Sequence, residues 1–211
     1  MFQKDYYQKQ ADTLKKKLTR RNFDVHICQD FKNAQMTALD LIDSSKTVAF
    51  GGSVTLQQSQ IIDALNQRKQ AVINRDLAET PEERHQLMRQ SLLADYYLTS
   101  VNGISEDGIL VNIDSVGNRV AALSYGPDKV IAFVTMNKIY GNLESTIETV
   151  RKKTAPENAF RLGLTTTPCI KTGQCGSCLK EECICSMISL IRRSKIDRRM
   201  TILLILENGG I

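Results

Sequence analysis

The sequence has no tryptophan, few aromatic residues and no long apolar run, and each absence excludes a class of protein. Aromatic residues make up only 6% of the 211 residues, which is little for a platform that stacks the bases of single-stranded nucleic acid. No stretch approaches the roughly 18 apolar residues of a membrane-spanning helix. The first residues, MFQKDYYQKQADTLKKK, lack the apolar core of a signal peptide. We therefore expect a cytoplasmic protein with no membrane span.

The excess of positive charge is small, with 28 basic and 23 acidic residues. It is densest at Lys15–Lys17 with Arg20 and Arg21, and at Arg192, Arg193, Lys195, Arg198 and Arg199. Basic clusters can bind phosphates of nucleic acid, but charge at helical spacing is more commonly the solvated face of a helix. We interpret both clusters in this second way and do not expect a nucleic-acid partner.

Apolar patterns of strand and helix type alternate along the chain. The predicted strands cover residues 23–28, 47–50, 71–74, 96–99, 109–111, 129–135 and 201–206, and the predicted helices cover 5–22, 34–42, 55–65, 81–93, 118–125, 143–153 and 186–193. Thr80, Pro81 and Glu83 form a capping box, and Pro156 is expected to end the helix before it. This alternation predicts an α/β fold whose mainly parallel sheet is covered by helices on both faces. With no internal repeat or linker, we expect one domain over residues 1–211.

The segment GGSVT directly follows a predicted buried strand. Gly51, Gly52 and Ser53 would let backbone N–H groups approach an anion at the start of a helix that Thr55 could cap. The segment lacks the Lys-Ser/Thr ending of a P-loop and is not GxGxxG. A phosphate or carboxylate site and a simple tight turn are both consistent with it.

The stretch from Tyr97 to Thr135 is unusually rich in acids, amides and glycines at strand ends. Ligands of open α/β sheets bind beyond the carboxyl ends of the strands, so we interpret this stretch as the floor of a site. Asn118 and Arg119 would begin a helix and bind an anion, while Glu106, Asp107 and Asp114 could act as general acid or base. The alternative is ordinary turn chemistry, because Asp-Gly is a common turn pair.

Five of the six cysteines lie between Cys169 and Cys185, in a loop of about residues 165–186. Disulfides are rare in a reducing cytosol, so clustered cysteines indicate metal or redox chemistry. Four of these thiolates could bind zinc or an iron–sulfur cluster. Free thiols in a surface loop and a redox disulfide are the alternatives.

At these residues the chain resembles a known family. GGSVT, the block YLTSVNGISEDGILVNIDSVGNRVAALSYGPDKVIAFVTMNKI, and the segments APENAFRLGLTTTPC, TGQCGSC and ICSM are similar to the LUD domain of bacterial lactate-utilisation proteins. The resemblance implies a fold of the ribose-phosphate isomerase, glucosamine-phosphate deaminase and CoA-transferase type. By position, it implies a pocket lined by Gly51, Gly52, Ser53, Glu106, Asp107, Asn112, Asp114, Asn118 and Arg119. It also implies that Cys169, Cys175, Cys178 and Cys185 are the recurring cysteines, with Cys183 an extra one.

The resemblance implies a role in lactate or organic-acid oxidation, with a small anionic ligand and iron–sulfur redox partner proteins. The chain carries no separate ferredoxin-like module, so a cluster would have to lie in its own cysteine loop. Two alternatives are a stand-alone isomerase or transferase for a phosphosugar or acyl-CoA, and a regulatory module that responds to metal or redox state. The residues alone leave open whether the domain is catalytic.

Overall fold

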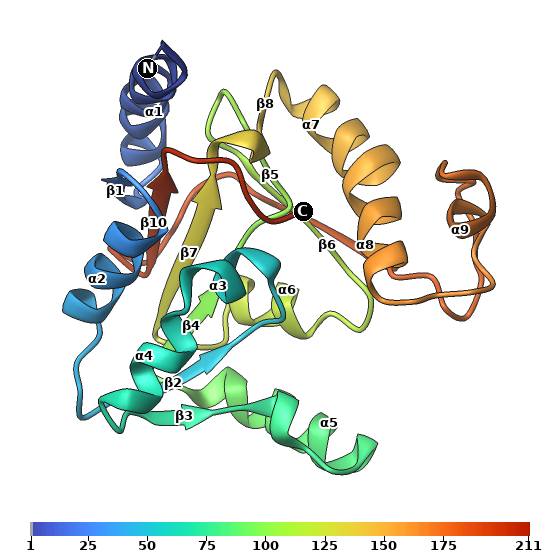
Figure 1. The fold of residues 1–211 in the computed structure, drawn as a ribbon, viewed down its shortest axis with the longest axis horizontal. Coiled ribbons are helices and arrows are strands. Elements are labelled where there is room, and N and C mark those ends of the chain that lie inside the picture. Colours follow the sequence, from blue (N-terminus) through green and yellow to red (C-terminus); the bar gives the residue numbers. More distant parts are fainter. Residues whose placement is uncertain (1) are drawn as a thin grey trace.

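A computed structural model describes residues 2–211, and a six-stranded parallel sheet lies at its centre (Figure 1). Its strands lie in the order β1-β10-β7-β4-β2-β3. Their bounds are β1 (Asp24–Cys28), β2 (Thr47–Phe50), β3 (Ala71–Ile73), β4 (Tyr96–Thr99), β7 (Lys129–Thr135) and β10 (Met200–Ile205). Because all neighbours are parallel, their carboxyl ends meet at one edge of the sheet. The predicted α/β fold is confirmed.

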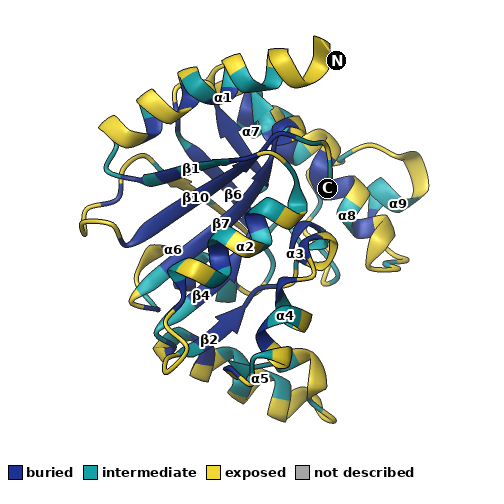
Figure 2. Cartoon of the chain, turned by 60° about the vertical axis from the view of Figure 1, so that its left-hand side comes forward, coloured by how far each residue is buried: buried dark blue, intermediate teal, exposed yellow. Residues whose placement is uncertain are grey.

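Helices cover both faces of this sheet, as β10 illustrates. Met200, Ile202 and Leu204 belong to one core cluster, and Leu203 and Ile205 to the other, because successive side chains of a strand point to opposite faces. The covering helices are α1 (Phe2–Arg20), α2 (Phe31–Leu41), α3 (Val54–Ser59), α4 (Ile61–Gln67), α5 (Pro81–Gln90) and α6 (Asn118–Ser124). The central strands β10, β7, β4 and β2 are mostly buried, and the outer faces of α1 and α2 are exposed (Figure 2).

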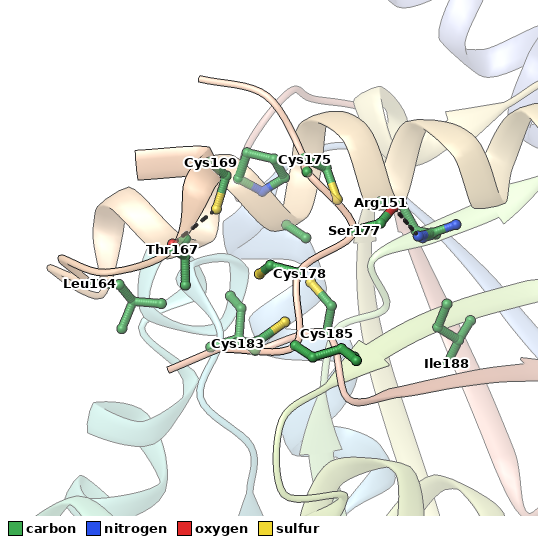
Figure 3. A pocket seen from close by; sticks show the side chains of 16 residues that line it. Arg151, Leu164, Thr167, Cys169, Cys175, Ser177, Cys178, Cys183, Cys185 and Ile188 are labelled. Atoms are coloured by element: carbon green, nitrogen blue, oxygen red, sulfur yellow. Dashed lines mark hydrogen bonds between the residues drawn. The ribbon is translucent and has the colours of Figure 1, made fainter. Parts of the chain in front are cut away.

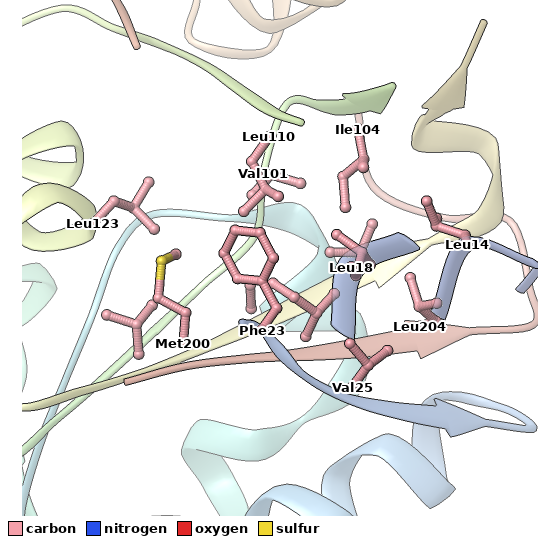
Figure 4. Packing of buried hydrophobic residues seen from close by; sticks show 14 of the residues in the cluster. Leu14, Leu18, Phe23, Val25, Val101, Ile104, Leu110, Leu123, Met200 and Leu204 are labelled. Carbon is pink, nitrogen blue, oxygen red and sulfur yellow. The ribbon is translucent and has the colours of Figure 1, made fainter. Parts of the chain in front are cut away.

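The cluster under α1 shows how the N-terminal helix is held. Leu14 and Leu18 are buried and lie over Phe23, Val25 and the end of β10 (Figure 4). Full burial of a leucine side chain contributes about 2 kcal/mol. Leu14 and Leu18 therefore attach the helix to the sheet.

A smaller sheet packs beside the first, with strand order β8-β5-β6-β9. It contains β5 (Gly103–Ser105), β6 (Leu110–Asp114), β8 (Ile139–Tyr140) and β9 (Met187–Ile191). The helix predicted for residues 186–193 is wrong, because this segment is strand β9, antiparallel to β6. Backbone pairing with a strand that is distant in sequence (Asn112 of β6 is opposite Ser189 of β9) decides its conformation, and local periodicity does not reveal that pairing.

The prediction that Pro156 ends a helix is also wrong. Helix α7 (Leu143–Thr149) continues through a π-helical turn, Val150–Thr154, into α8 (Ala155–Arg161), with Pro156 in the first turn of α8. Proline has no N–H to donate and its ring crowds the preceding turn, and the wider π turn is compatible with both constraints.

Several predicted helix ends differ from the structure. Ser53, not Thr55, caps α3 by accepting from Leu56 N, and a left-handed residue, Gln60, separates α3 from α4. Asn118, a residue type that favours the N-cap, is instead the first residue of α6, and Gly117 is the cap residue. The Thr80 cap of α5 is confirmed.

The remaining elements are short. They are the 3₁₀ turns Arg75–Leu77, Ser91–Leu93 and Met136–Lys138, and helix α9 (Pro168–Thr172) inside the cysteine loop. Within residues 2–211, no helix is both long and apolar enough to cross a membrane.

Candidate functional site

A glycine at the end of β2 brings an arginine into the site. A Cβ added to Gly52 would lie 2.7 Å from Nη2 of Arg75, so the absence of a side chain lets this guanidinium lie against the backbone. Arg75 comes from the 3₁₀ turn after β3, and its side chain is only 13% exposed. The Gly-Gly turn therefore adjoins a cation.

Lys138 lies just beyond the carboxyl end of β7 and is 3% exposed. Its Nζ donates to Thr55 Oγ1 and to Ser100 Oγ, each at 3.0 Å. No carboxylate of the described residues lies within ion-pair distance of it. Burial, with a smaller contribution from the charge of Arg119, lowers the pKa of Lys138 to about 7.

Arg119 extends from α6 toward the small sheet. Its Nη2 donates to Asn102 Oδ1 at 3.1 Å and to the carbonyl of Ile113. Its Nε is buried and has no hydrogen-bond partner in the described part of the chain. Burial lowers the pKa of Arg119, and the charge of Asp114 acts in the opposite direction. The guanidinium remains charged at neutral pH and is incompletely paired.

Asp114 occupies the start of α6. Its Oδ2 accepts from Arg119 N at 2.9 Å and Val120 N at 3.2 Å, and its Oδ1 accepts from Ser115 N. A carboxylate here satisfies N–H groups of the first turn. The expectation that Asn118 and Arg119 offer an open helix start to an external anion is therefore corrected, since Asp114 already serves as that anion.

These residues surround a basic cleft beyond the carboxyl ends of β2, β4 and β7. It consists of two adjoining hollows of about 40 and 150 Å³, both lined by Gly52, Arg119, Asn158 and Arg161. Ser53, Ser100, Asn102 and Lys138 line the smaller hollow, and Arg75, Asp114, Asn118 and Ile184 line the larger one. Four basic side chains and one acidic side chain thus face the cleft across residues 2–211.

Not every residue of the predicted site lies there. Gly52, Ser53, Asp114, Asn118 and Arg119 do. The acids of the SEDG turn do not, because Glu106 and Asp107 are at the opposite end of the β5–β6 hairpin. Glu106 lies beside Tyr6 and Lys9 of α1, and the Asp107 carbonyl accepts from Arg21. The prediction that Glu106 and Asp107 lie close to Arg119 is therefore wrong.

Two further predicted residues, Gly51 and Asn112, are buried outside the cleft. Gly51 is buried where a Cβ would meet the Tyr97 hydroxyl at 2.9 Å. Asn112 is 0% exposed, and neither its Oδ1 nor its Nδ2 has a partner among the residues described. It is paired across the sheet with Ser189 of β9, whose Oγ also has none. Neither Gly51 nor Asn112 lines either hollow of the cleft.

Three cations of the cleft were missed by the sequence analysis. Arg75 lies outside the segments that resemble the LUD domain, whereas Lys138 and Arg161 lie inside the quoted segments MNKI and APENAFRLGLTTTPC, which gave them no role. A second signal for Lys138 was its position, because it follows the most apolar strand by three residues and so lies at the edge where ligands bind.

A second hollow, of about 180 Å³, is lined by the five cysteines of the loop (Figure 3). They are Cys169, Cys175, Cys178, Cys183 and Cys185, all free thiols. Arg151, from the π turn, also lines it. Ile184 lines both this hollow and the larger part of the basic cleft, so the cysteine loop forms part of the wall of that cleft.

The thiols influence one another but are not in ligand positions. Burial, followed by the neighbouring thiols of Cys183, Cys175 and Cys169, raises the pKa of Cys185 to about 12. Thr167 Oγ1 lies 3.2 Å from Cys169 Sγ. In residues 2–211 no three His, Cys, Asp or Glu side chains are placed to hold a metal ion. The donor set itself, five sulfurs around one hollow, fits zinc or iron chemically.

Comparisons with known proteins agree with this architecture. The sequence pattern of the family described as "LUD domain" matches residues 11–205. A crystal structure of a DUF162 family protein from Deinococcus radiodurans is similar, with a TM-score of 0.54 and 13% identity over 94% of this chain and 98% of that one. At that identity the likeness concerns the fold alone. No curated protein matches the chain.

Proposed function

This chain belongs to the LUD domain family, and on that premise we propose that it binds a small organic anion in the basic cleft and serves bacterial oxidation of lactate or a related acid. The observation that carries the proposal is the charge of the cleft. Lys138 is buried and Arg119 is half-buried with an enclosed Nε, and neither cation has a carboxylate within ion-pair distance among residues 2–211. Burying an unpaired charge is costly, and a bound carboxylate would offset that cost.

The dimensions of the cleft favour a small ligand. A hollow of about 40 Å³ accommodates only a few non-hydrogen atoms, because one water molecule needs about 10–15 Å³ on the same measure. The adjoining 150 Å³ part leaves room for a short chain but not for a nucleotide-containing acyl-CoA. This size supports an organic acid over the transferase alternative.

Arg161 is the residue for a direct test, because it is exposed and its Nε donates only to Asn158 Oδ1 of its own helix. We expect Arg161→Gln to weaken binding of pyruvate or L-lactate about tenfold, since a charge-assisted hydrogen bond contributes about 1.5–3 kcal/mol. Isothermal titration calorimetry measures this, and exposed Arg193→Gln is the matched control. Equal affinities in all three proteins would contradict binding in the cleft.

The same titration separates the remaining alternatives. Ribose 5-phosphate binding that exceeds pyruvate binding and depends on Arg161 would favour the isomerase alternative. Inorganic phosphate alone binding as tightly as either would indicate a general anion site.

We also propose that the cysteine hollow binds zinc or an iron–sulfur cluster through Cys169, Cys175, Cys178 and Cys185. The supporting observation is that all of the loop thiols line one hollow although they are spread over 17 residues of sequence, from 169 to 185. When bound, a cluster would supply electron transfer and connect the domain to redox partner proteins. Zinc would stabilise the loop, and with it the wall around Ile184.

Elemental analysis and an absorption spectrum of protein purified without oxygen test this second proposal. Cys178→Ser should lose the metal, whereas Cys183→Ser, a change at the extra cysteine of the same hollow, should retain it. Iron with sulfide would favour electron transfer, and zinc a structural site. Metal content that is equal in both variants would remove Cys178 from the ligand set.

A further inference from the structure

We propose that Lys138 is a reactive amine that forms an imine with the carbonyl carbon of a small 2-oxo acid held in the basic cleft. This inference deepens the proposed function and rests on anion binding at that site.

The amine of Lys138 is held in a fixed position beside the smaller hollow. Lys138 ends the 3₁₀ turn after β7 and lines the smaller hollow together with Arg119 and Arg161. Its Nζ is held between the hydroxyls of Thr55 and Ser100 at 3.0 Å. The chain covers the amine on another side, since a Cβ on Gly210 would lie 3.0 Å from Nζ. The amine is thus fixed at the wall of a small polar cavity.

The surroundings of Lys138 are unusual for a structural lysine. A buried ammonium is normally paired with a carboxylate, but none of the described residues supplies one. Arg119 is the charged side chain that acts on it, and like charge together with burial lowers the pKa of Lys138 to about 7. At neutral pH a substantial fraction of the Lys138 side chains is therefore unprotonated and has a free lone pair. An ordinary lysine is almost fully protonated at this pH.

The same cleft selects the class of carbonyl compound. Arg119 and Arg161 share the hollow with Lys138, and guanidinium groups are the preferred partners of carboxylates. A ligand with a carboxylate next to its carbonyl places both groups in a space of about 40 Å³. Uncharged aldehydes and ketones lack a carboxylate for these guanidinium groups.

The step balances without an oxidant or reductant. The neutral amine adds its electron pair to the carbonyl carbon, the carbon–oxygen π pair moves to oxygen, and a proton passes from the nitrogen to that oxygen. The resulting carbinolamine then loses the nitrogen-bound proton and the hydroxyl group as water, and a C=N bond forms. Thr55 and Ser100 are the hydroxyl groups in contact with the nitrogen and are placed to move these protons.

Reductive trapping tests the proposal on the intact protein. We expect sodium cyanoborohydride with pyruvate or glyoxylate to give one saturable adduct, detected by intact mass and located at Lys138 by peptide mapping. Lys138→Met and Lys138→Arg should lose this adduct, and Lys32→Met, a change at an exposed lysine of α2, should keep it. The labelling rate should level off just above neutral pH, whereas ordinary lysines continue to gain reactivity up to about pH 10.

Two results would overturn the proposal. One is labelling spread over exposed lysines and unchanged in both Lys138 variants, and the other is no adduct at all. Calorimetry with pyruvate in the absence of reductant tests anion binding separately from formation of the adduct. Binding that depends on Arg161 but gives no adduct would reject the imine and leave the proposed function intact. Absence of both binding and adduct would reject both.

Discussion

Replacement of Lys138 by methionine should stabilise the protein at neutral pH, although it changes a fully enclosed residue. A folded-state pKa of about 7 against an ordinary 10.5 corresponds to roughly 4–5 kcal/mol of destabilisation, at about 1.4 kcal/mol per pH unit. Methionine has a similar length and no charge, but Thr55 and Ser100 each lose a donor. That loss costs about 1–3 kcal/mol in total. The net gain expected below pH 7 is about 2 kcal/mol.

The pH dependence distinguishes this explanation from a simple packing effect. Between about pH 7 and pH 10.5 the unfolded chain retains the proton on Lys138 and the folded chain does not, so wild-type stability increases with pH in this window. Below it both states are protonated and the full penalty applies. The advantage of Lys138→Met should therefore decrease by up to about 1.4 kcal/mol per pH unit above pH 7.

Urea unfolding of wild type and Lys138→Met across this pH range measures the difference between their free energies of unfolding. Groups that titrate equally in both proteins do not contribute to that difference. A variant that is less stable than wild type at pH 7, or an advantage that is constant with pH, would refute the reasoning. Natural proteins retain destabilising residues such as Lys138 where their function requires them.

Three other changes test single features of the structure. Arg199 is 5% exposed, and its guanidinium donates to three carbonyl groups around the end of α6. Urea unfolding of Arg199→Ala should therefore show a free energy of unfolding lower by about 3 kcal/mol. A decrease as small as that of Arg193→Ala, at an exposed residue, would contradict this. Asp114→Ala should lower stability by about 1 kcal/mol through loss of the α6 cap, and an unchanged melting temperature would reject the capping role. Gly52→Ala should displace the Arg75 guanidinium and weaken pyruvate binding several-fold with stability nearly unchanged; unaltered affinity in calorimetry would remove Arg75 from the site.

The basic cluster near the C-terminus shows where sequence analysis failed on charge. Its residues were interpreted as solvated, and Arg192, Arg193, Lys195 and Arg198 are exposed. Arg199 is buried, because the last turn of α6 presents carbonyl groups that need donors. Neighbouring arginines in one run thus have opposite environments, and no local pattern separates them.

The sequence by itself determined the strands of the large sheet, the Thr80 cap of α5 and the edge of the sheet where a site would lie. Residues 96–99 and 129–135 form β4 and β7 as predicted, and Thr80 caps α5, because apolar runs and caps are local signals. Gly52 and Arg119 were found because the carboxyl ends of parallel strands converge.

Only the tertiary structure decided which side chains meet in the cleft. It separates Glu106 and Asp107 from Arg119, makes Asp114 a cap, and encloses Lys138 between Thr55 and Ser100. Burial and partner distances depend on segments far apart in the chain, and these two quantities set the charge and reactivity of a side chain. For that reason the edge of the sheet that carries the cleft could be predicted from the sequence, and the set of side chains that meet in the cleft could not.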